Sequence, residues 1–307
     1  MISRRRFICL AAASAGLMIG AAPSFATFPL VYRWRGIALG AAASLTVHHE
    51  RAQEISERAL LELQRLEQIF SLYRPSSELS RLNTDGRLAN PSFEMLKLLS
   101  LCGSLNARTD GAFNPAVQPL WKLYAEKLST GARPSDQDIA SIRPLCDWSG
   151  VRVDPREVSF SRPGMALTLN GIAQGYIADK ITQLLRQEGV ENTLVNMGEI
   201  AALGHQADGQ PWNIGIADPQ NRERVLRDIK LENAAIATSS SLGTILDERG
   251  EIGHILDPAT GKPATGPRQI SVIAPDAAVA DGLSTAFCLM DDENIEPFRR
   301  EYRILIL

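Results

Sequence analysis

The sequence predicts an α+β protein with mixed sheets and flanking helices, and three features of the 307-residue chain indicate this. Apolar residues recur at helical spacing along Glu50–Phe70, with Glu and Arg between them. The second half instead alternates short apolar segments with helix-like ones. No repeat, low-complexity tract or flexible linker divides the chain. We therefore expect about 280 residues to bury one large core, as a single domain or two fused lobes.

The first 26 residues predict a twin-arginine export signal. Arg4, Arg5 and Arg6 precede an uncharged run over 8–22, and Ser24-Phe25-Ala26 supplies small residues for cleavage before Thr27. The alternative is an uncleaved membrane anchor, but the run is shorter than the roughly 20 residues that span a bilayer. We expect residues 1–26 to be removed and residues 27–307 to reach the periplasm as a folded domain.

The charge of the remaining chain argues against nucleic acid as a partner. Loss of the three arginines leaves 29 basic against 35 acidic residues, a net charge of −6, which also disfavours anionic membrane surfaces. Three widely spaced cysteines remain, an odd number that suggests neither a metal cluster nor a disulfide framework. We expect Cys102, Cys146 and Cys288 to be buried thiols.

The first half should begin with a strand and continue with helices. Pro91-Ser92 starts the second long helix, and turn-rich polar residues mark the loops. In chain order the expected elements are a strand over Gly36–His48, a helix over Glu50–Phe70, a loop over Tyr73–Glu78, a helix over Phe93–Asn106, and a surface loop over Gly131–Asp138 that leads into a short helix near Ile139.

The second half should alternate strands and helices. A strand near Ala166–Leu169 is expected to run through Asn170–Gly175 into a helix that carries Ile177, Ile181 and Leu185. Further elements are expected as strands at Thr193–Met197, Trp212–Ala217, Ala234–Thr238 and Gln269–Ala274, a last helix over Ala280–Met290, and a strand-like end at Arg303–Leu307.

Two glycine-containing clusters could bind a ligand, although each also has a plain structural interpretation. Thr109–Pro115 is a compact turn that we expect to expose one aromatic ring. Asn170–Gly175 places backbone amides at a helix start, where N–H groups and the helix dipole can hold a phosphate. The alternative for the second cluster is close packing of the helix, which glycine also permits. Asn196–Glu199 forms another tight turn after a strand.

The last two clusters contain the candidate base and the candidate metal ligands. His254 lies near Asp257, which could orient it as a proton acceptor, although a lone histidine is usually structural. Asp281 and Thr285 stand four apart on one helix face, so a carboxylate and a hydroxyl could share one hard cation. The alternative is that Asp281 merely stabilises the first helical turn.

In this order the clusters resemble the ApbE family, the FAD:protein FMN transferases. The similarity extends from Gly36 to Met290 and includes Ser71–Asn83, Thr109–Pro115, His254–Gly261 and Ala280–Thr285. The resemblance implies one ApbE-like unit with a nucleotide cleft. It also implies Mg²⁺-dependent transfer of FMN from FAD to a Thr or Ser hydroxyl of a partner protein, with release of AMP.

The resemblance also assigns roles to residues. His254 is the candidate base, and the ligands of Mg²⁺ would be Asp281, Thr285, Ser284 and the backbone carbonyl of Gly171. The positions that would contact FAD are Leu39, Tyr73, Ala112, Phe113, Asn114, Thr168, Gln174 and Leu256.

Several of these positions depart from the family pattern. Thr168 replaces an Asp and Gln174 a Lys or Glu, so a charge is lost at each. Leu39 replaces a Met, Asn114 an Asp, and Glu199 the second glycine of a Gly-Gly pair. We expect these changes to affect the affinity for FAD and the rate of FMN transfer more than the fold. They leave open two alternatives, a non-catalytic FAD-binding or carrier protein and a metal-dependent FAD pyrophosphatase.

The export signal and the sequence around it look like the exported NosX-type subgroup of this family. Members of that subgroup flavinylate electron-transfer proteins that serve nitrous-oxide reduction. The expected partner is therefore a periplasmic acceptor flavoprotein with a Ser/Thr flavinylation motif, such as a NosR-like membrane protein.

Overall fold

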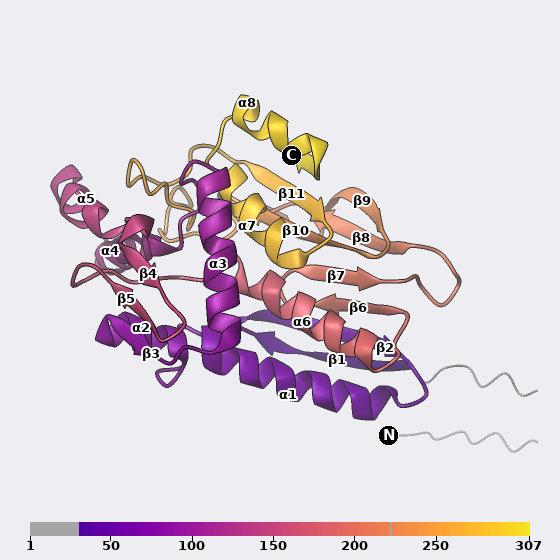
Figure 1. The fold of residues 1–307 in the computed structure, drawn as a ribbon. Coiled ribbons are helices and arrows are strands. Elements are labelled where there is room, and N and C mark those ends of the chain that lie inside the picture. Colours follow the sequence, from indigo (N-terminus) through magenta and orange to yellow (C-terminus); the bar gives the residue numbers. More distant parts are fainter. Residues whose placement is uncertain (1–30, 222) are drawn as a thin grey trace, which may run out of the picture.

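A seven-stranded antiparallel sheet organises the chain in the computed structural model, which describes residues 31–221 and 223–307 (Figure 1). Its strand order is β1-β2-β6-β7-β10-β11-β12, so the first strand forms one edge and the last strand the other. The predicted export signal lies outside the described residues. The strands of this sheet are β1 (Val31–Ala38), β2 (Ala41–His48), β6 (Thr193–Asn196), β7 (Ile200–Leu203), β10 (Ala234–Ser240), β11 (Gln269–Ala274) and β12 (Arg303–Ile306).

Helices cover one face of this sheet and a two-stranded hairpin covers the other (Figure 1). The alternation of side chains along β10 explains this arrangement, because Ala235 and Ala237 join the core beneath the helices whereas Ile236 packs with Trp212 and Ile214 of the hairpin. The helices on the sheet are α1 (Ala52–Phe70), α3 (Phe93–Arg108), α6 (Ala173–Gln187) and α7 (Ala277–Phe287), and the hairpin is β8 (Trp212–Ala217) and β9 (Val225–Leu231).

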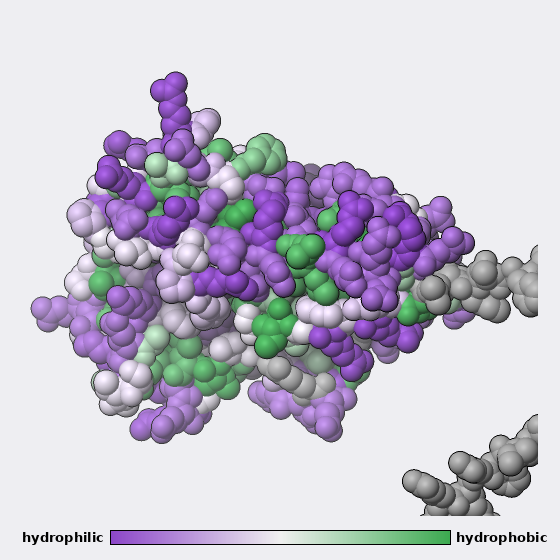
Figure 2. Space-filling view, turned by 90° about the horizontal axis from the view of Figure 1, so that it is seen from below, coloured by the Kyte–Doolittle hydropathy of each residue, from purple (hydrophilic) through white to green (hydrophobic). Residues whose placement is uncertain are grey.

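Helix α1 confirms the amphipathic prediction. Ile55, Leu63 and Leu66 are buried against the sheet, while the Glu and Arg residues between them remain on the outer side. Figure 2 shows the molecule from below, where hydrophilic residues surround small groups of hydrophobic ones. Helix α1 is stabilised mainly because its apolar residues are buried against the sheet, and helix propensity alone would not suffice.

A smaller group of elements forms a third apolar cluster beside the sheet. Leu120 and Tyr124 of α4 meet Ile139 of α5, and the Tyr124 hydroxyl donates to the Gly261 carbonyl at 3.0 Å. This bond ties the cluster to the segment that carries His254. The remaining elements are α2 (Glu78–Asp85), α4 (Gln118–Ser129), α5 (Asp136–Ile142), α8 (Asp292–Ile295), the sheet of β3 (Arg87–Ala89), β5 (Glu157–Phe160) and β4 (Val151–Val153), and 3₁₀ turns at Pro115–Val117, Arg143–Leu145, Trp148–Gly150 and Glu296–Arg300.

Two predicted strands were wrong. The single strand over Gly36–His48 is a hairpin that starts at Val31 and turns at Leu39-Gly40, where both residues have positive φ. The Ala166–Leu169 segment is not a strand, because both backbone groups of Leu167 bond the Asn83 side chain, at 2.7 and 2.8 Å, instead of a neighbouring strand. The helix predicted over Ala280–Met290 spans Ala277–Phe287, and the short helix α8 follows it.

Three cysteines are buried free thiols, as predicted: Cys102, Cys146 and Cys288. Burial raises the pKa of the Cys146 thiol to about 11 and that of Cys288 to about 12, so both stay protonated at neutral pH. Among the helices of the described residues, none has the length and apolarity needed to cross a membrane.

Candidate functional site

A cavity of about 570 Å³ lies between the sheet with its helices and the smaller cluster. One wall comes from α6, α7 and the end of β10, and the other from the segments around Asn114 and His254. All of the predicted site residues except Leu39 and Ser284 line it. The fold therefore brings together residues that are up to about two hundred positions apart in the chain.

Asp281 and Thr285 lie on adjacent turns of α7 and face this cavity. Asp281 is 3% exposed, and its Oδ2 accepts a hydrogen bond from the Gly175 N–H at 3.1 Å. Burial, with repulsion from Asp179, raises the pKa of Asp281 to about 7. A Cβ placed on Gly171 would lie 3.0 Å from the Thr285 Oγ1, so this glycine lets the backbone pass directly over Thr285.

A hydroxyl group that the sequence analysis missed joins these residues. Ser239 Oγ lies 2.8 Å from Ser284 Oγ and 3.2 Å from Thr285 Oγ1. Ser284 also donates to the Asp281 carbonyl at 3.0 Å and is fully buried behind the cavity wall. The available signal was the Thr238–Ser241 polar run, which ends an apolar strand where it meets the cavity.

Glu199 is the second residue missed as a site residue. It follows the turn after β6, lines the cavity, and accepts a hydrogen bond from the Thr238 N–H at 3.2 Å. Burial and the nearby Asp281 raise the pKa of Glu199 well above its usual value. Within residues 31–221 and 223–307, neither Glu199 nor Asp281 takes part in a salt bridge.

These donors fit a hard divalent cation. The buried Asp281 and the half-buried Glu199, without a protein cation beside them, are costly when ionised, and a divalent ion would offset that cost. The part of the chain that the structure describes holds no group of three or more His, Cys, Asp or Glu side chains placed for a metal. The site combines carboxylate oxygens with the Thr285 hydroxyl, which is the oxygen chemistry that Mg²⁺ prefers.

His254 lines the opposite wall, but Asp257 does not orient it. The two Asp257 oxygens instead accept from the Ala259 N–H at 2.8 Å and the Thr260 hydroxyl at 2.7 Å. His254 Nδ1 lies 3.3 Å from the Thr244 carbonyl, which can accept only if Nδ1 carries the proton. That tautomer leaves Nε2 free as a proton acceptor. Burial lowers the pKa of His254, which keeps the ring neutral at physiological pH.

Tyr73 lines the cavity, and the β1–β2 turn lies close to its ring. Tyr73 is 69% exposed, and a Cβ on Gly40 would approach its ring to 3.2 Å. Glu67 fixes this arrangement because it accepts from the Leu39 N–H at 3.0 Å and from Arg74 at 2.6 Å. Leu39 is held by Glu67 outside the cavity lining, and Tyr73 offers an open aromatic face.

The prediction that the Thr109–Pro115 turn exposes an aromatic ring is wrong. Phe113 is 4% exposed, because its ring packs on α7 beside Gly282. Asn114 is used structurally, since its Oδ1 caps the Ala116 N–H at 2.9 Å and its Nδ2 donates to the Cys146 carbonyl at 2.8 Å. These two residues shape the cavity wall, which Ala112 also lines. Leu256 adds a further buried apolar contact.

The start of α6 favours the packing interpretation over a phosphate-binding one. The N–H groups of Ile172 and Ala173 bond the Leu169 carbonyl, and that of Gly175 bonds Asp281. A Cβ on Gly175 would meet the Ala277 carbonyl oxygen at 2.3 Å, so glycine is required for α6 to contact α7. Thr168 and Gln174 still line the cavity, with Gln174 packed against Gly198.

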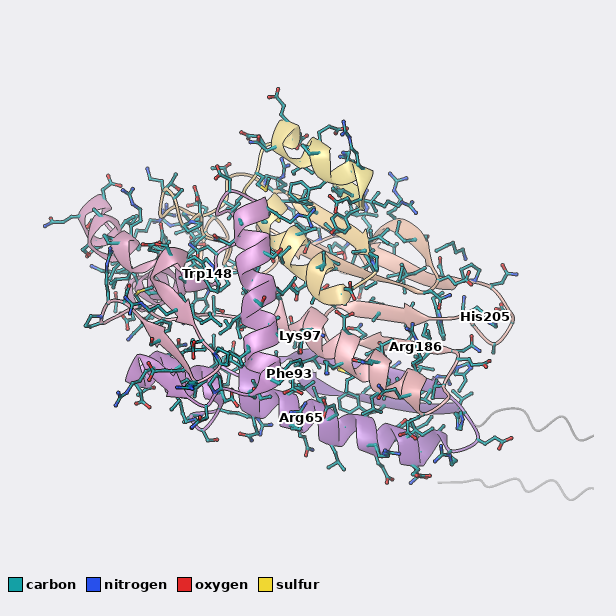
Figure 3. The ribbon with its side chains drawn as sticks, viewed as in Figure 1. Arg65, Phe93, Lys97, Trp148, Arg186 and His205 are labelled. Carbon is teal, nitrogen blue, oxygen red and sulfur yellow. The ribbon has the colours of Figure 1, made fainter. Side chains whose placement is uncertain are left out.

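A larger cavity of about 700 Å³ lies elsewhere, among α3, α6, α7 and β7, and none of the predicted site residues line it. Figure 3 labels Lys97 and Arg186, which mark its α3 and α6 sides. Asp179 is part of this lining and caps the first two N–H groups of α7, at 2.7 and 2.9 Å. This larger cavity therefore borders the helix that carries Asp281, but the predicted site residues line the smaller cavity.

Known proteins resemble this chain over most of its length. The ApbE family model matches residues 39–304. The FAD:protein FMN transferase of Vibrio cholerae is 31% identical over 233 residues, which are 73% of this chain and 70% of that protein. The one from Treponema pallidum is 30% identical and covers 87% and 80% of the two chains. The crystal structure of the ApbE protein from Thermotoga maritima has a TM-score of 0.82 at 29% identity, covering 90% of this chain and 94% of its own. The chain therefore belongs to the ApbE family.

Proposed function

We propose that this protein transfers FMN from FAD to a Thr or Ser hydroxyl of an acceptor protein and releases AMP. The main observation in support of this proposal is that one cavity holds the oxygen donors of Asp281 and Thr285 on one wall and the neutral His254 on the other. The curated relatives that bear the name FAD:protein FMN transferase support the same activity.

In the proposed reaction, His254 Nε2 takes the proton of the acceptor hydroxyl. The hydroxyl oxygen bonds to the phosphorus of the FMN moiety, the pyrophosphate bond breaks, and AMP leaves with the bridging oxygen. Asp281, Thr285 and the Gly171 carbonyl would hold Mg²⁺. The chemistry that this ion supplies when bound is neutralisation of the pyrophosphate charge. Tyr73 would stack on a ring of FAD.

The departures at Thr168 and Gln174 bear on rate and affinity. Thr168 keeps a hydrogen-bonding oxygen, while Gln174 offers a neutral amide where the family has a charged residue. Two alternative activities follow if these changes remove transfer: FAD binding without turnover, and hydrolysis of FAD with water in place of the acceptor hydroxyl.

One assay separates these three activities. The purified chain is incubated with FAD, Mg²⁺ and an acceptor domain that carries a Ser/Thr-Gly-Ala-Thr-like motif. A fluorescent acceptor band in a denaturing gel, together with AMP, is the result that we expect. Free FMN plus AMP with an unlabelled acceptor would instead identify a pyrophosphatase, and bound FAD without products would identify a carrier.

We also propose that the protein acts in the periplasm after twin-arginine export, on a redox protein whose flavin domain faces that compartment. The paired arginines at 4–6 motivate this proposal. A NosR-like acceptor and a role in nitrous-oxide reduction would follow from the NosX-type start. Fractionation of cells that produce the chain with Arg4 and Arg5 changed to Lys tests the route, because periplasmic recovery equal to wild type would contradict it.

A further inference from the structure

We infer that Glu199 supplies a second carboxylate to the divalent-cation site at Asp281. This inference rests on the proposed function, because it concerns the cation that the transfer reaction requires.

The backbone fixes where Glu199 points. The Gly198 N–H bonds the Asn196 side chain at 3.0 Å, and the Met197 N–H bonds the Glu199 carbonyl at 3.0 Å. Gly198 has φ +102°, and a Cβ on it would lie 2.4 Å from the Gln174 Nε2. The turn is thus closed on itself and pressed against α6, which directs the Glu199 side chain into the cavity.

A short series of contacts connects Glu199 with the predicted metal ligands. Its Oε2 is held by the Thr238 N–H, and the next residue, Ser239, contacts Thr285 Oγ1 at 3.2 Å. The turn that carries Glu199 also touches Gln174, whose neighbour Gly175 bonds Asp281. Glu199 and Asp281 line the same cavity, and Asp281 contributes to the raised pKa of Glu199.

Nothing in the described part of the chain neutralises this pair. The hydrogen bond from Thr238 uses one Glu199 oxygen, and the structure gives the other no protein donor among the described residues. Gln174, the side chain packed on this turn, carries no charge. A free carboxylate oxygen beside Asp281 is a suitable ligand for a hard cation.

The test compares Mn²⁺ binding by the purified wild-type chain and by Glu199→Gln, measured by electron paramagnetic resonance without FAD. Glutamine keeps the size and the acceptor for the Thr238 N–H but removes the charge. We expect the dissociation constant to rise by about 10–100-fold. Asp281→Asn should lose binding, and Glu78→Gln, which neutralises a carboxylate bonded to Ser92, should bind as wild type.

Unchanged Mn²⁺ affinity in Glu199→Gln would overturn the inference and would identify Glu199 as a protonated hydrogen-bonding residue. Thermal unfolding without metal controls for folding, because removal of a buried charge should leave the melting temperature equal or higher. Glu199→Asp keeps the charge and should retain part of the affinity. A wild-type chain that binds Mn²⁺ through Glu199 but does not label the acceptor would refute the proposed function alone.

Discussion

A backbone carbonyl, and not the nearby carboxylate, orients the His254 ring. Asp257, three residues away, turns to Ala259 and Thr260, while the Thr244 carbonyl faces Nδ1. A neutral carbonyl orients the ring but does not stabilise its charged form as strongly as a carboxylate would, so burial dominates and the pKa of His254 falls. The result is a ring whose pKa lies below its ordinary value, so that it is available as a base at neutral pH.

Two substitutions test this orientation. We expect His254→Ala to slow FMN transfer by about 10²–10⁴-fold, the usual contribution of a general base, without weakening FAD binding. Asp257→Asn should leave unchanged the pH at which activity falls on the acid side, which should lie below 6.5 in both proteins. Rates are measured as acceptor labelling between pH 5 and pH 8. A clear shift of the acid limb in Asp257→Asn would show that the carboxylate does act on the ring.

At the scale of elements, the α6–α7 contact positions Asp281. Gly175 lets the two helices touch and at the same time donates its N–H to Asp281. Gly175→Ala would place a methyl group 2.3 Å from the Ala277 carbonyl oxygen, so the helices must separate. We expect the free energy of unfolding to fall by about 1–3 kcal/mol despite the better helix propensity of alanine.

Gly103→Ala is the matched control in urea denaturation. Gly103 also lies inside a helix, α3, but its new methyl group would meet Trp148 at an ordinary 3.6 Å. Alanine should therefore stabilise the protein by up to about 1 kcal/mol there. If both variants changed stability by the same amount, the α6–α7 contact would have no special role.

At the scale of the whole molecule, the sequence identified the long helices and most central strands but not how they assemble. The apolar residues of α1 recur at helical spacing within one short segment, so the sequence alone predicts this helix. The Leu39-Gly40 turn lacks the Asn-Gly pair that is typical of tight hairpins, so the sequence predicted β1 and β2 as a single strand. Asn83 bonds Leu167 across eighty-four residues, which no local pattern reveals. Glu199 and Ser239 were missed for the same reason, because only the packed sheet places them beside Asp281.

Buried carboxyl groups should make the stability of the whole molecule depend on pH, and Asp179 offers the cleanest test. Burial raises its pKa to about 7, although two α7 N–H groups partly oppose this. A carboxyl whose pKa is higher in the folded chain binds more protons when folded. Its contribution to stability is therefore complete below about pH 4, the unfolded pKa, and is lost as the pH rises through about 7.

We therefore expect the wild-type chain to lose unfolding free energy between pH 5 and pH 8, with a contribution from Asp179 on the order of 3 kcal/mol at most over that range. Asp179→Asn has no proton to lose, so its stability should fall less over the same range. Urea denaturation in EDTA at both pH values measures the difference, since EDTA keeps divalent ions from binding near Asp281. Equal pH dependence in the two proteins would mean that the α7 amides hold Asp179 ionised in the fold, with its pKa near the unfolded value. In that case Asp179 would be an ordinary helix cap, and any remaining pH dependence would have to come from other groups, with Asp281 and Glu199 the first to examine.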